Sequence, residues 1–172
     1  MPASRSLALL IAAAVRKAAE HVLWLGDIDW DEDLGGACAA ASQALHRLLL
    51  EYGFNSLFIE GEFDIDGFKD PSDEFIGHCW VLVGYKNSKP ELIDVTATQF
   101  GEWFPPIHIP KGDELNIYRA EPDLTWSMYA ENQEGSSRIR RYARELLVLA
   151  AIGRIRSADK LFTLLSEERD AP

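Results

Sequence analysis

Two runs of strand-forming residues, 76–85 and 91–95, set the first limit on how this chain can fold. The first run reads Ile-Gly-His-Cys-Trp-Val-Leu-Val-Gly-Tyr, and valine and aromatic residues favour strands. Lysine, asparagine, serine and proline fill the short segment between the runs, and these residue types are common in turns. The two runs are therefore predicted to pair as an antiparallel β-hairpin.

The segments before the hairpin favour two helices and one more strand. Residues 4–24 are rich in alanine and leucine, which are strong helix formers. A second helix is expected to open at Gly35 and Gly36 and to stop near Gly53, because glycine commonly follows the last turn of a helix. The segment 56–63 carries a strand pattern.

The segments after the hairpin favour irregular structure and then helices. Residues 97–136 are rich in aromatic residues and proline, with room for a short strand at either 107–109 or 115–118. Residues 137–152 predict an amphipathic helix, and Ser157 is a suitable cap for a last one.

The expected fold class is α+β, because helices are followed by a β-meander and then by further helices. The N-terminal helices are expected to pack on an antiparallel β-sheet. A chain of 172 residues usually forms one domain. We expect residues 1–172 to form a single domain, with a core over about 30–100 and a helical C-terminal extension over about 137–168.

Composition narrows the classes of function. The formal net charge is −11, which argues against a protein that binds the phosphate backbone of nucleic acids, because such proteins present a basic face. Two cysteines are fewer than a secreted disulfide scaffold would carry. A single disulfide between these two cysteines is the alternative to two free thiols. The apolar run 7–15 is followed at once by Arg16 and Lys17 and is shorter than the roughly 20 residues that span a bilayer. We expect a cytoplasmic protein with no membrane or nucleic-acid partner, and leave secretion or delivery as an effector open.

Cys38 has the setting of a reactive thiol. It lies in the first turn of the second predicted helix, where backbone N–H groups and the helix dipole stabilise a thiolate. Gly35, Gly36 and Ala37 are small and leave the backbone before it open to a substrate carbonyl. The backbone N–H of Cys38 is then a natural donor to the oxyanion that forms on this carbonyl.

His78 and Asp94 lie on the two strands of the predicted hairpin. If residues 86–88 form its loop, Asp94 lies opposite Trp80, and His78 is its diagonal neighbour on the same face, roughly 7–8 Å away. A loop of two residues would place Asp94 opposite Val81 and on the wrong face. An attacking thiol needs a base and a group that orients the base, so this hypothesis depends on the register of the hairpin.

The ordered set of a cysteine at a helix start, Gly-His-Cys-Trp-Val on a strand and Ile-Asp-Val-Thr on the next strand resembles the papain-like and transglutaminase-like cysteine superfamily. The resemblance covers roughly residues 30–100. It implies that Cys38 is the nucleophile, that His78 is the base and that Asp94 orients it. It also implies a helix packed on an antiparallel sheet, no cofactor, and a protein or peptide substrate.

The donors to the oxyanion are where the chain departs from this superfamily. Papain-like peptidases place a glutamine a few residues before the cysteine, and no glutamine or asparagine precedes Cys38. Transglutaminases use a tryptophan indole, a part that Trp30 or Trp24 would play here. Gly36, through the backbone, and Gln99, as a side-chain donor near the cleft, are the other oxyanion or substrate candidates.

The resemblance implies attack on an amide carbonyl through a thioester. Water as the acceptor gives peptidase or glutamine-deamidase activity, and an amine gives transglutamination. These three reactions use the same residues, so the sequence does not choose among them. It does not determine the oligomeric state either. Acidic residues 31–33 oppose thiolate formation unless they point to solvent. A second hypothesis is a catalytically incomplete relative that acts as a protein-binding or inhibitory module, which the missing glutamine favours.

Each of these features also has a purely structural interpretation. A free cysteine is commonly buried, so Cys38 can be inert core, and Cys79 is expected in the core because it alternates to the face opposite His78. The acidic segment 64–74 lacks the glycine spacing of an EF-hand and is expected to be a solvated loop. No zinc site is expected, because the cysteines and histidines lack paired short spacings. The arginines of segment 138–156 are expected to be solvated or paired with the chain's own acids, with a partner surface as the alternative.

Overall fold

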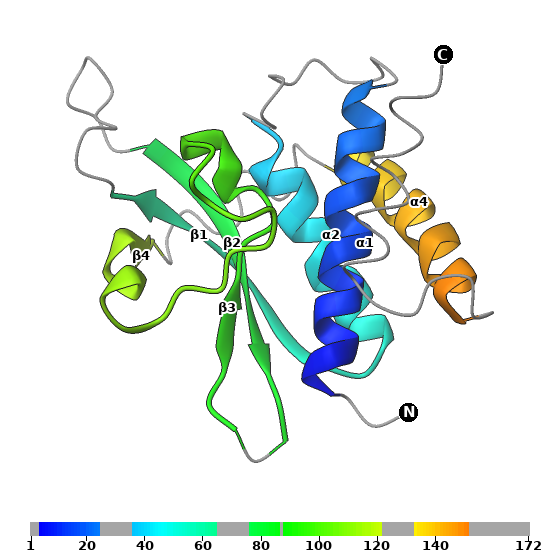
Figure 1. The fold of residues 1–172 in the computed structure, drawn as a ribbon, viewed down its shortest axis with the longest axis horizontal. Helices are drawn as coiled ribbons and strands as arrows, with labels where there is room; N and C mark the ends of the chain where they lie inside the picture. The colour runs from blue at the N-terminus through cyan, green and yellow to red at the C-terminus, as the bar shows by residue number, and fades with distance from the viewer. Residues whose placement is uncertain (1–3, 25–35, 65–75, 87, 122–132, 152–172) are drawn as a thin grey trace.

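The computed structural model describes residues 4–24, 36–64, 76–86, 88–121 and 133–151. It combines helices with an antiparallel sheet of four strands, so the predicted α+β class is confirmed. In Figure 1 the sheet lies on one side of the molecule and the long helices lie on the other. This arrangement leaves one face of the sheet against helices, as expected for a helix-on-sheet domain.

Within the described residues the long helices are α1 (Arg5–Trp24), α2 (Cys38–Glu51) and α4 (Gln133–Ala151). Two short 3₁₀ helices are η1 (Ala97–Phe100) and η2 (Gly112–Ile117). The strands are β1 (Asn55–Phe63), β2 (Ile76–Gly84), β3 (Glu91–Ile93) and β4 (Tyr118–Ala120). They form one sheet in the order β3-β2-β1-β4, and every neighbouring pair is antiparallel.

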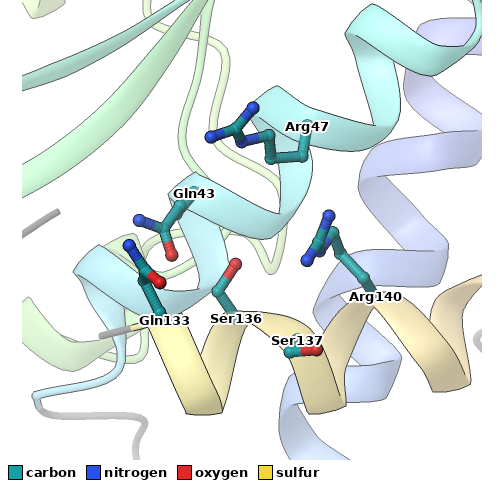
Figure 2. A pocket seen from close by; sticks show the side chains of 6 residues that line it. All are labelled: Gln43, Arg47, Gln133, Ser136, Ser137 and Arg140. Atoms are coloured by element: carbon teal, nitrogen blue, oxygen red, sulfur yellow. The ribbon is translucent and has the colours of Figure 1, made fainter. Parts of the chain in front are cut away.

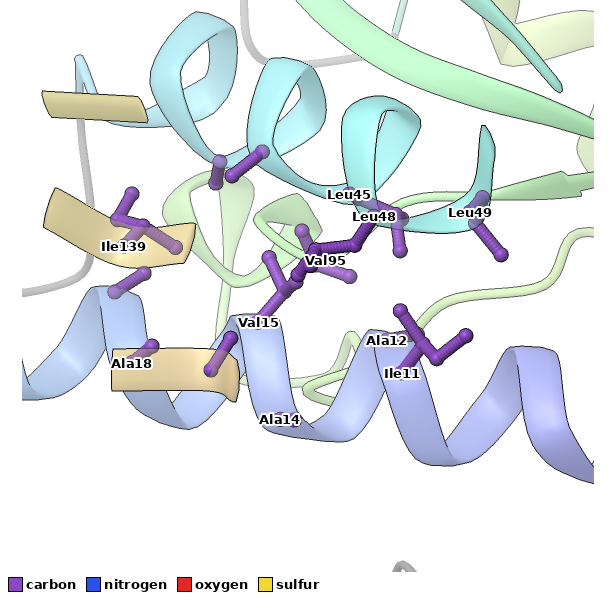
Figure 3. Packing of buried hydrophobic residues seen from close by; sticks show 14 of the residues in the cluster. Ile11, Ala12, Ala14, Val15, Ala18, Leu45, Leu48, Leu49, Val95 and Ile139 are labelled. Carbon is purple, nitrogen blue, oxygen red and sulfur yellow. The ribbon is translucent and has the colours of Figure 1, made fainter. Parts of the chain in front are cut away.

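Helix α1 is buried on nearly every side. Residues 11–15 have no exposed surface, and three of them are alanine. Small side chains allow helix axes to approach closely, and both α2 and α4 pack on α1. Figure 3 shows Val15 of α1 meeting Leu48 of α2 and Val95 in the space between these elements.

Helix α2 ends where the glycine pattern predicts. The backbone N–H of Tyr52 still donates to Leu48, and that of Phe54 donates back to Leu49. Gly53 between them has a φ of +81°, in the left-handed region that favours glycine over residues with a Cβ. The chain then turns directly into β1, which packs against α2.

The register of the β2–β3 hairpin is the one that the site hypothesis requires. Val81 pairs with Ile93 and Leu82 pairs with Leu92, so one further step places Trp80 opposite Asp94. The connection itself differs from the expected loop of three residues, because β2 ends at Gly84 and β3 begins only at Glu91. Register rather than loop length decides the face, and Asp94 therefore shares a face with His78.

The segment after the hairpin corrects the expected strands. Residues 107–109 do not form a regular strand; His108 makes an isolated antiparallel bridge with Asp94 through two backbone hydrogen bonds of 2.8 and 2.9 Å. Residues 115–117 belong to η2, and the strand follows it at 118–120, where β4 pairs with β1. Pairing with a distant strand, which no local pattern encodes, fixes the position of β4.

The C-terminal helix begins earlier than its sequence pattern indicates. The pattern predicts a start at Ser137, whereas α4 begins at Gln133. Gly135 and Ser136 have low helix propensity, but both are buried as α4 packs on its neighbours, and packing outweighs propensity. The last predicted helix, capped by Ser157, lies outside the described residues.

In the described part of the chain, no helix combines the length and the apolar character needed to cross a bilayer.

Candidate active site

Cys38 is the first residue of α2, in the position predicted for a nucleophile. Gly36 has a φ of +80° and Ala37 is the N-terminal cap without a side-chain hydrogen bond. The first turn of a helix has backbone N–H groups without intrahelical acceptors, and their dipoles favour a negative charge. The thiol is only 4% exposed and packs in a small cluster with Ala39, Phe58 and Cys79.

His78 and Asp94 form a fully buried pair. His78 Nε2 lies 2.7 Å from Asp94 Oδ2, and neither side chain has exposed surface. The rings of Phe63 and Phe100 meet the imidazole edge-on, with centroids 5.1 and 4.8 Å from its own. Aromatic walls exclude water, so the imidazole is held in one orientation by the carboxylate and by packing.

The carboxylate of Asp94 has hydrogen-bond partners on both of its oxygens. Oδ1 accepts from the backbone N–H of Thr96 at 2.8 Å and from its hydroxyl at 3.2 Å. Oδ2 accepts from the hydroxyl of Tyr118 at 2.8 Å as well as from His78. Burial by itself raises the pKa of Asp94, but His78 and the bonds from Thr96 and Tyr118 outweigh burial and lower this pKa below its usual value. Asp94 is therefore held as an anion.

Tyr118 and His108 extend the network beyond the three predicted residues. Because the Tyr118 hydroxyl donates to Asp94, its oxygen accepts from His108 Nδ1 at 2.9 Å. Burial, followed by the charge of Asp94, raises the pKa of Tyr118, so the phenol stays protonated. Burial lowers the pKa of His108, which favours the neutral ring, and Glu114 lies 3.8 Å from its Nε2. The sequence offered no local signal that Tyr118 and His108 belong to this network, since β4 reaches the site only by pairing with β1.

Cys38 and His78 stabilise each other's charge. A hydrogen bond from the Cys79 thiol lowers the pKa of Cys38 most, burial opposes it, and the bond and charge of His78 lower it further, so that it lies well below 9.0. Burial lowers the pKa of His78, but Asp94 and then Cys38 outweigh burial and raise it to about 10. Between these two values the favoured state is a thiolate next to an imidazolium.

Cys79 lies in the core, as its alternation on β2 predicts, but it also contacts the nucleophile candidate. Its side chain is fully buried, and Ser42 of α2 donates to its backbone carbonyl at 2.9 Å. The hydrogen bond to Cys38, and then burial, raise the pKa of Cys79, so that this thiol keeps its proton and donates it. Both cysteines are free thiols. Their interaction joins the N-terminus of α2 to β2.

Gln99 lies on the side of His78 that faces away from Asp94. Its Nε2 is 3.0 Å from His78 Nδ1, the ring nitrogen left over by the bond to Asp94. With a neutral imidazole the amide donates to Nδ1; beside an imidazolium the same side chain, rotated about its last bond, presents its oxygen instead. Gln99 is thus in contact with His78, the candidate base.

The remaining oxyanion candidates are only partly placed. Gly36 precedes the start of α2 by two residues. Trp30 and the side chain of Trp24 lie outside the described residues, as do the acidic segments 31–33 and 65–74. Among the described residues, no group of three or more histidine, cysteine, aspartate or glutamate side chains is arranged to hold a metal ion.

The aromatic segment after η1 lines a hollow of about 450 Å³ beside this network. Trp103, Phe104 and His108 are among its walls, and the Trp103 side chain is 67% exposed. His108 also donates a hydrogen bond to Tyr118, which donates to Asp94, so this hollow borders the hydrogen-bond network of Asp94.

Comparison of the chain with protein-family models, with curated proteins and with solved structures gives no match in any of the three. Function is therefore inferred from the geometry of the site alone.

Proposed function

We propose that the chain is a thiol-dependent hydrolase or acyltransferase that attacks an amide carbonyl with Cys38. The observation that carries this proposal is the buried bond of 2.7 Å between His78 Nε2 and Asp94 Oδ2. This bond leaves Nδ1 as the basic nitrogen of the ring; the Gln99 amide lies 3.0 Å from it and gives way to the thiol when His78 acts as the base, and His78 lowers the pKa of Cys38. Nucleophile, base and orienting acid are then coupled in one network.

In the proposed reaction the Cys38 thiolate adds to the carbonyl carbon of an amide. The C–N bond breaks, the leaving amine or ammonia takes a proton from the imidazolium of His78, and a thioester remains on Cys38. His78 then removes a proton from water or from an acceptor amine as it attacks the thioester. The product leaves and the thiolate is restored next to the imidazolium.

Asp94 keeps its negative charge throughout this cycle. Four hydrogen bonds hold its two oxygens, and they compensate a charge that has no contact with solvent. The carboxylate holds the proton of His78 on Nε2 and so leaves Nδ1 as the nitrogen that exchanges a proton with Cys38. For the oxyanion we propose the backbone N–H groups at the start of α2, assisted by the amide of Gln99.

The substrate class that we propose is a protein or peptide amide, including the side chain of glutamine. A net charge of −11 favours encounter with basic protein surfaces. Two free thiols suit a reducing compartment such as the cytoplasm. Peptide hydrolysis, glutamine deamidation and transamidation remain alternatives that use the same side chains.

Alkylation of Cys38 by iodoacetamide tests the proposed thiolate. Mass spectrometry distinguishes modification of Cys38 from that of Cys79, and the pH midpoint of the rate is the readout, because low exposure slows the rate itself without moving the midpoint. We expect a midpoint well below 9.0 that rises in His78→Gln. The matched control is His46→Gln, a half-buried histidine bonded to Ser56, which should leave the midpoint unchanged.

A midpoint equal to that of the unfolded chain would contradict the proposal and would favour a non-catalytic binding module. The acceptor is found by incubating the protein with a glutamine-rich protein, with and without a primary amine. Peptide cleavage, ammonia release alone, and an amine adduct identify the three reactions, and each should disappear in Cys38→Ala.

A further inference from the structure

A second hollow, lined by polar side chains, lies between α2 and α4, away from the thiol. Its volume is about 230 Å³, several times the roughly 30 Å³ that one water occupies in the liquid. Figure 2 shows the side chains from both helices around it, with the guanidinium groups of Arg47 and Arg140 and the hydroxyl of Ser136 turned towards the same space. Its lining consists of Gln43, Arg47, Gln133, Ser136, Ser137 and Arg140.

Every described side chain that lines this hollow can donate a hydrogen bond, and none is acidic. Two of them carry a positive charge in a chain whose net charge is −11. Gln43 and Ser136 are 3% and 2% exposed, so two of these donors lie inside the protein rather than on its surface. A wall made of donors is complementary to a ligand that has several acceptor oxygens and a negative charge.

Arg140 provides an independent sign of a missing acceptor. Its Nε is buried and has no hydrogen-bond partner among the described residues. Its Nη1 lies 3.9 Å from Glu51, but that carboxylate is held more closely by Arg144, whose Nη2 and Nε are 2.6 and 3.2 Å from its two oxygens. A buried guanidinium donor without an acceptor is costly, and a bound anion would supply the acceptor.

We propose that this hollow is a binding site for the phosphate group of an inorganic phosphate ion or a small phosphate monoester. A phosphate offers more acceptor oxygens and more charge than a single carboxylate, and arginine matches its geometry with paired N–H groups. Arg47 and Arg140 contact the phosphate from opposite helices, and the hydroxyls of Ser136 and Ser137 add neutral donors. The ligand thereby joins α2 to α4.

This site is separate from the proposed thiol chemistry. Ser42 faces the sheet, where it bonds the carbonyl of Cys79. At about 100° per residue, Gln43 and Arg47 point to the side of α2 opposite Cys38. The proposed phosphate site is therefore independent of the proposed enzymatic function.

Calorimetric titration of the full chain with inorganic phosphate, and separately with glycerol phosphate, tests the proposal. We expect saturable binding of at least one of them, weakened at least about tenfold in Arg140→Gln and in Arg47→Gln, because each removes a charged hydrogen-bonding group. The matched control is Arg141→Gln, which removes the same charge from the neighbouring position of α4, where the guanidinium lies over the ring of Tyr142. Thermal melts identify a variant that fails to fold, and Arg47, which is exposed, offers the safer of the two substitutions.

Binding of the ester but not of the free ion supports the proposal and identifies a phosphate monoester as the ligand. Binding of neither overturns it. Equal weakening in Arg141→Gln also overturns it, because the attraction is then a diffuse property of the helix. Citrate or succinate binding in the absence of any phosphate binding overturns the choice of phosphate.

Discussion

The buried carboxylate of Asp94 shows how single residues make the candidate site possible. A charge without solvent contact is tolerated only when hydrogen bonds and an opposite charge compensate it. Here His78, Thr96 and Tyr118 together satisfy both oxygens. Removing any one of these partners changes both stability and the protonation of the pair.

The Cys38–His78 pair makes stability depend on pH in a particular way. The pKa of His78 is raised from 6.5 to about 10, so its contribution is fully present below pH 6.5 and is lost as the pH rises through about 10. The pKa of Cys38 is lowered from 9.0, so its contribution is present above pH 9.0 and is lost as the pH falls through the lowered value. Between 6.5 and 9.0 the two slopes oppose each other, because folding only moves a proton from thiol to imidazole.

We therefore expect Cys38 and His78 together to make a nearly constant contribution to the free energy of unfolding between pH 6.5 and 9.0 in the wild type. In Cys38→Ser only His78 titrates, so its contribution should fall across the same interval. Urea unfolding of both proteins at several pH values measures this, and the difference between them removes the effect of other titrating groups. Parallel curves for the two proteins would contradict the ion pair.

Removal of the Tyr118 hydroxyl should destabilise the protein. Tyr118→Phe deletes a hydrogen bond to the charged Asp94 and leaves His108 Nδ1 without its partner, for an expected loss of about 1.5–3 kcal/mol. Chemical denaturation gives the value, and the alkylation midpoint of Cys38 should shift as well. Tyr52→Phe, at a tyrosine that is 41% exposed, is the control and should be nearly neutral.

Among the elements, the segment from the end of β3 through η1 matters most, because it carries Asp94, Thr96 and Gln99. Arg16 of α1 holds this segment in place: its Nη1 donates to the carbonyl of Val95 at 2.9 Å and to the hydroxyl of Thr98 at 2.8 Å. Arg16 is 7% exposed, so these bonds are shielded from water. The position of Asp94 thus depends on a helix that contributes no residue to the candidate site.

Arg16→Met should cost about 3 kcal/mol, because it leaves a buried carbonyl unsatisfied and removes one of the two cations next to Glu20. Differential denaturation against Arg5→Met provides the comparison. Arg5 pairs with Glu91 at the surface, with side chains 48% and 29% exposed, so its loss should cost below about 1 kcal/mol. Equal costs for the two variants would show that Arg16 does not anchor the segment.

For the molecule as a whole, the helices depend on one another more than on the sheet. α1 is enclosed by α2 and α4, and buried side chains from all three belong to one hydrophobic cluster. Ile139 of α4 belongs to this cluster and has no exposed surface, as Figure 3 illustrates near Ala18 of α1. α4 is therefore part of the hydrophobic core and not a peripheral addition to it.

Ile139→Ala should lower the free energy of unfolding by about 2–5 kcal/mol, through lost burial and the cavity left behind. The control on the same helix is Val148→Ala, at a side chain that is 59% exposed and should change stability little. Guanidinium unfolding measures both. A small effect of Ile139→Ala would mean that α4 is a dispensable extension.

Local patterns in the sequence predicted the α+β fold class and placed the three candidate residues Cys38, His78 and Asp94 on their helix and strands. The strand period of two placed His78 and Asp94 on one face once the register was chosen, and the glycines before Cys38 marked the start of a helix. These signals are short-range, since each depends on neighbours within a few positions along the chain. The α+β class follows from the order of such segments.

Only the tertiary structure decided which distant groups complete the site. Tyr118 and His108 reach Asp94 because β4 pairs with β1, and Arg16 reaches the same segment from the first helix. The polar hollow between α2 and α4 likewise joins side chains about 90 positions apart in the chain. Contacts of this kind depend on how helices and strands pack, and packing follows from the shape of the whole core, which no local period records.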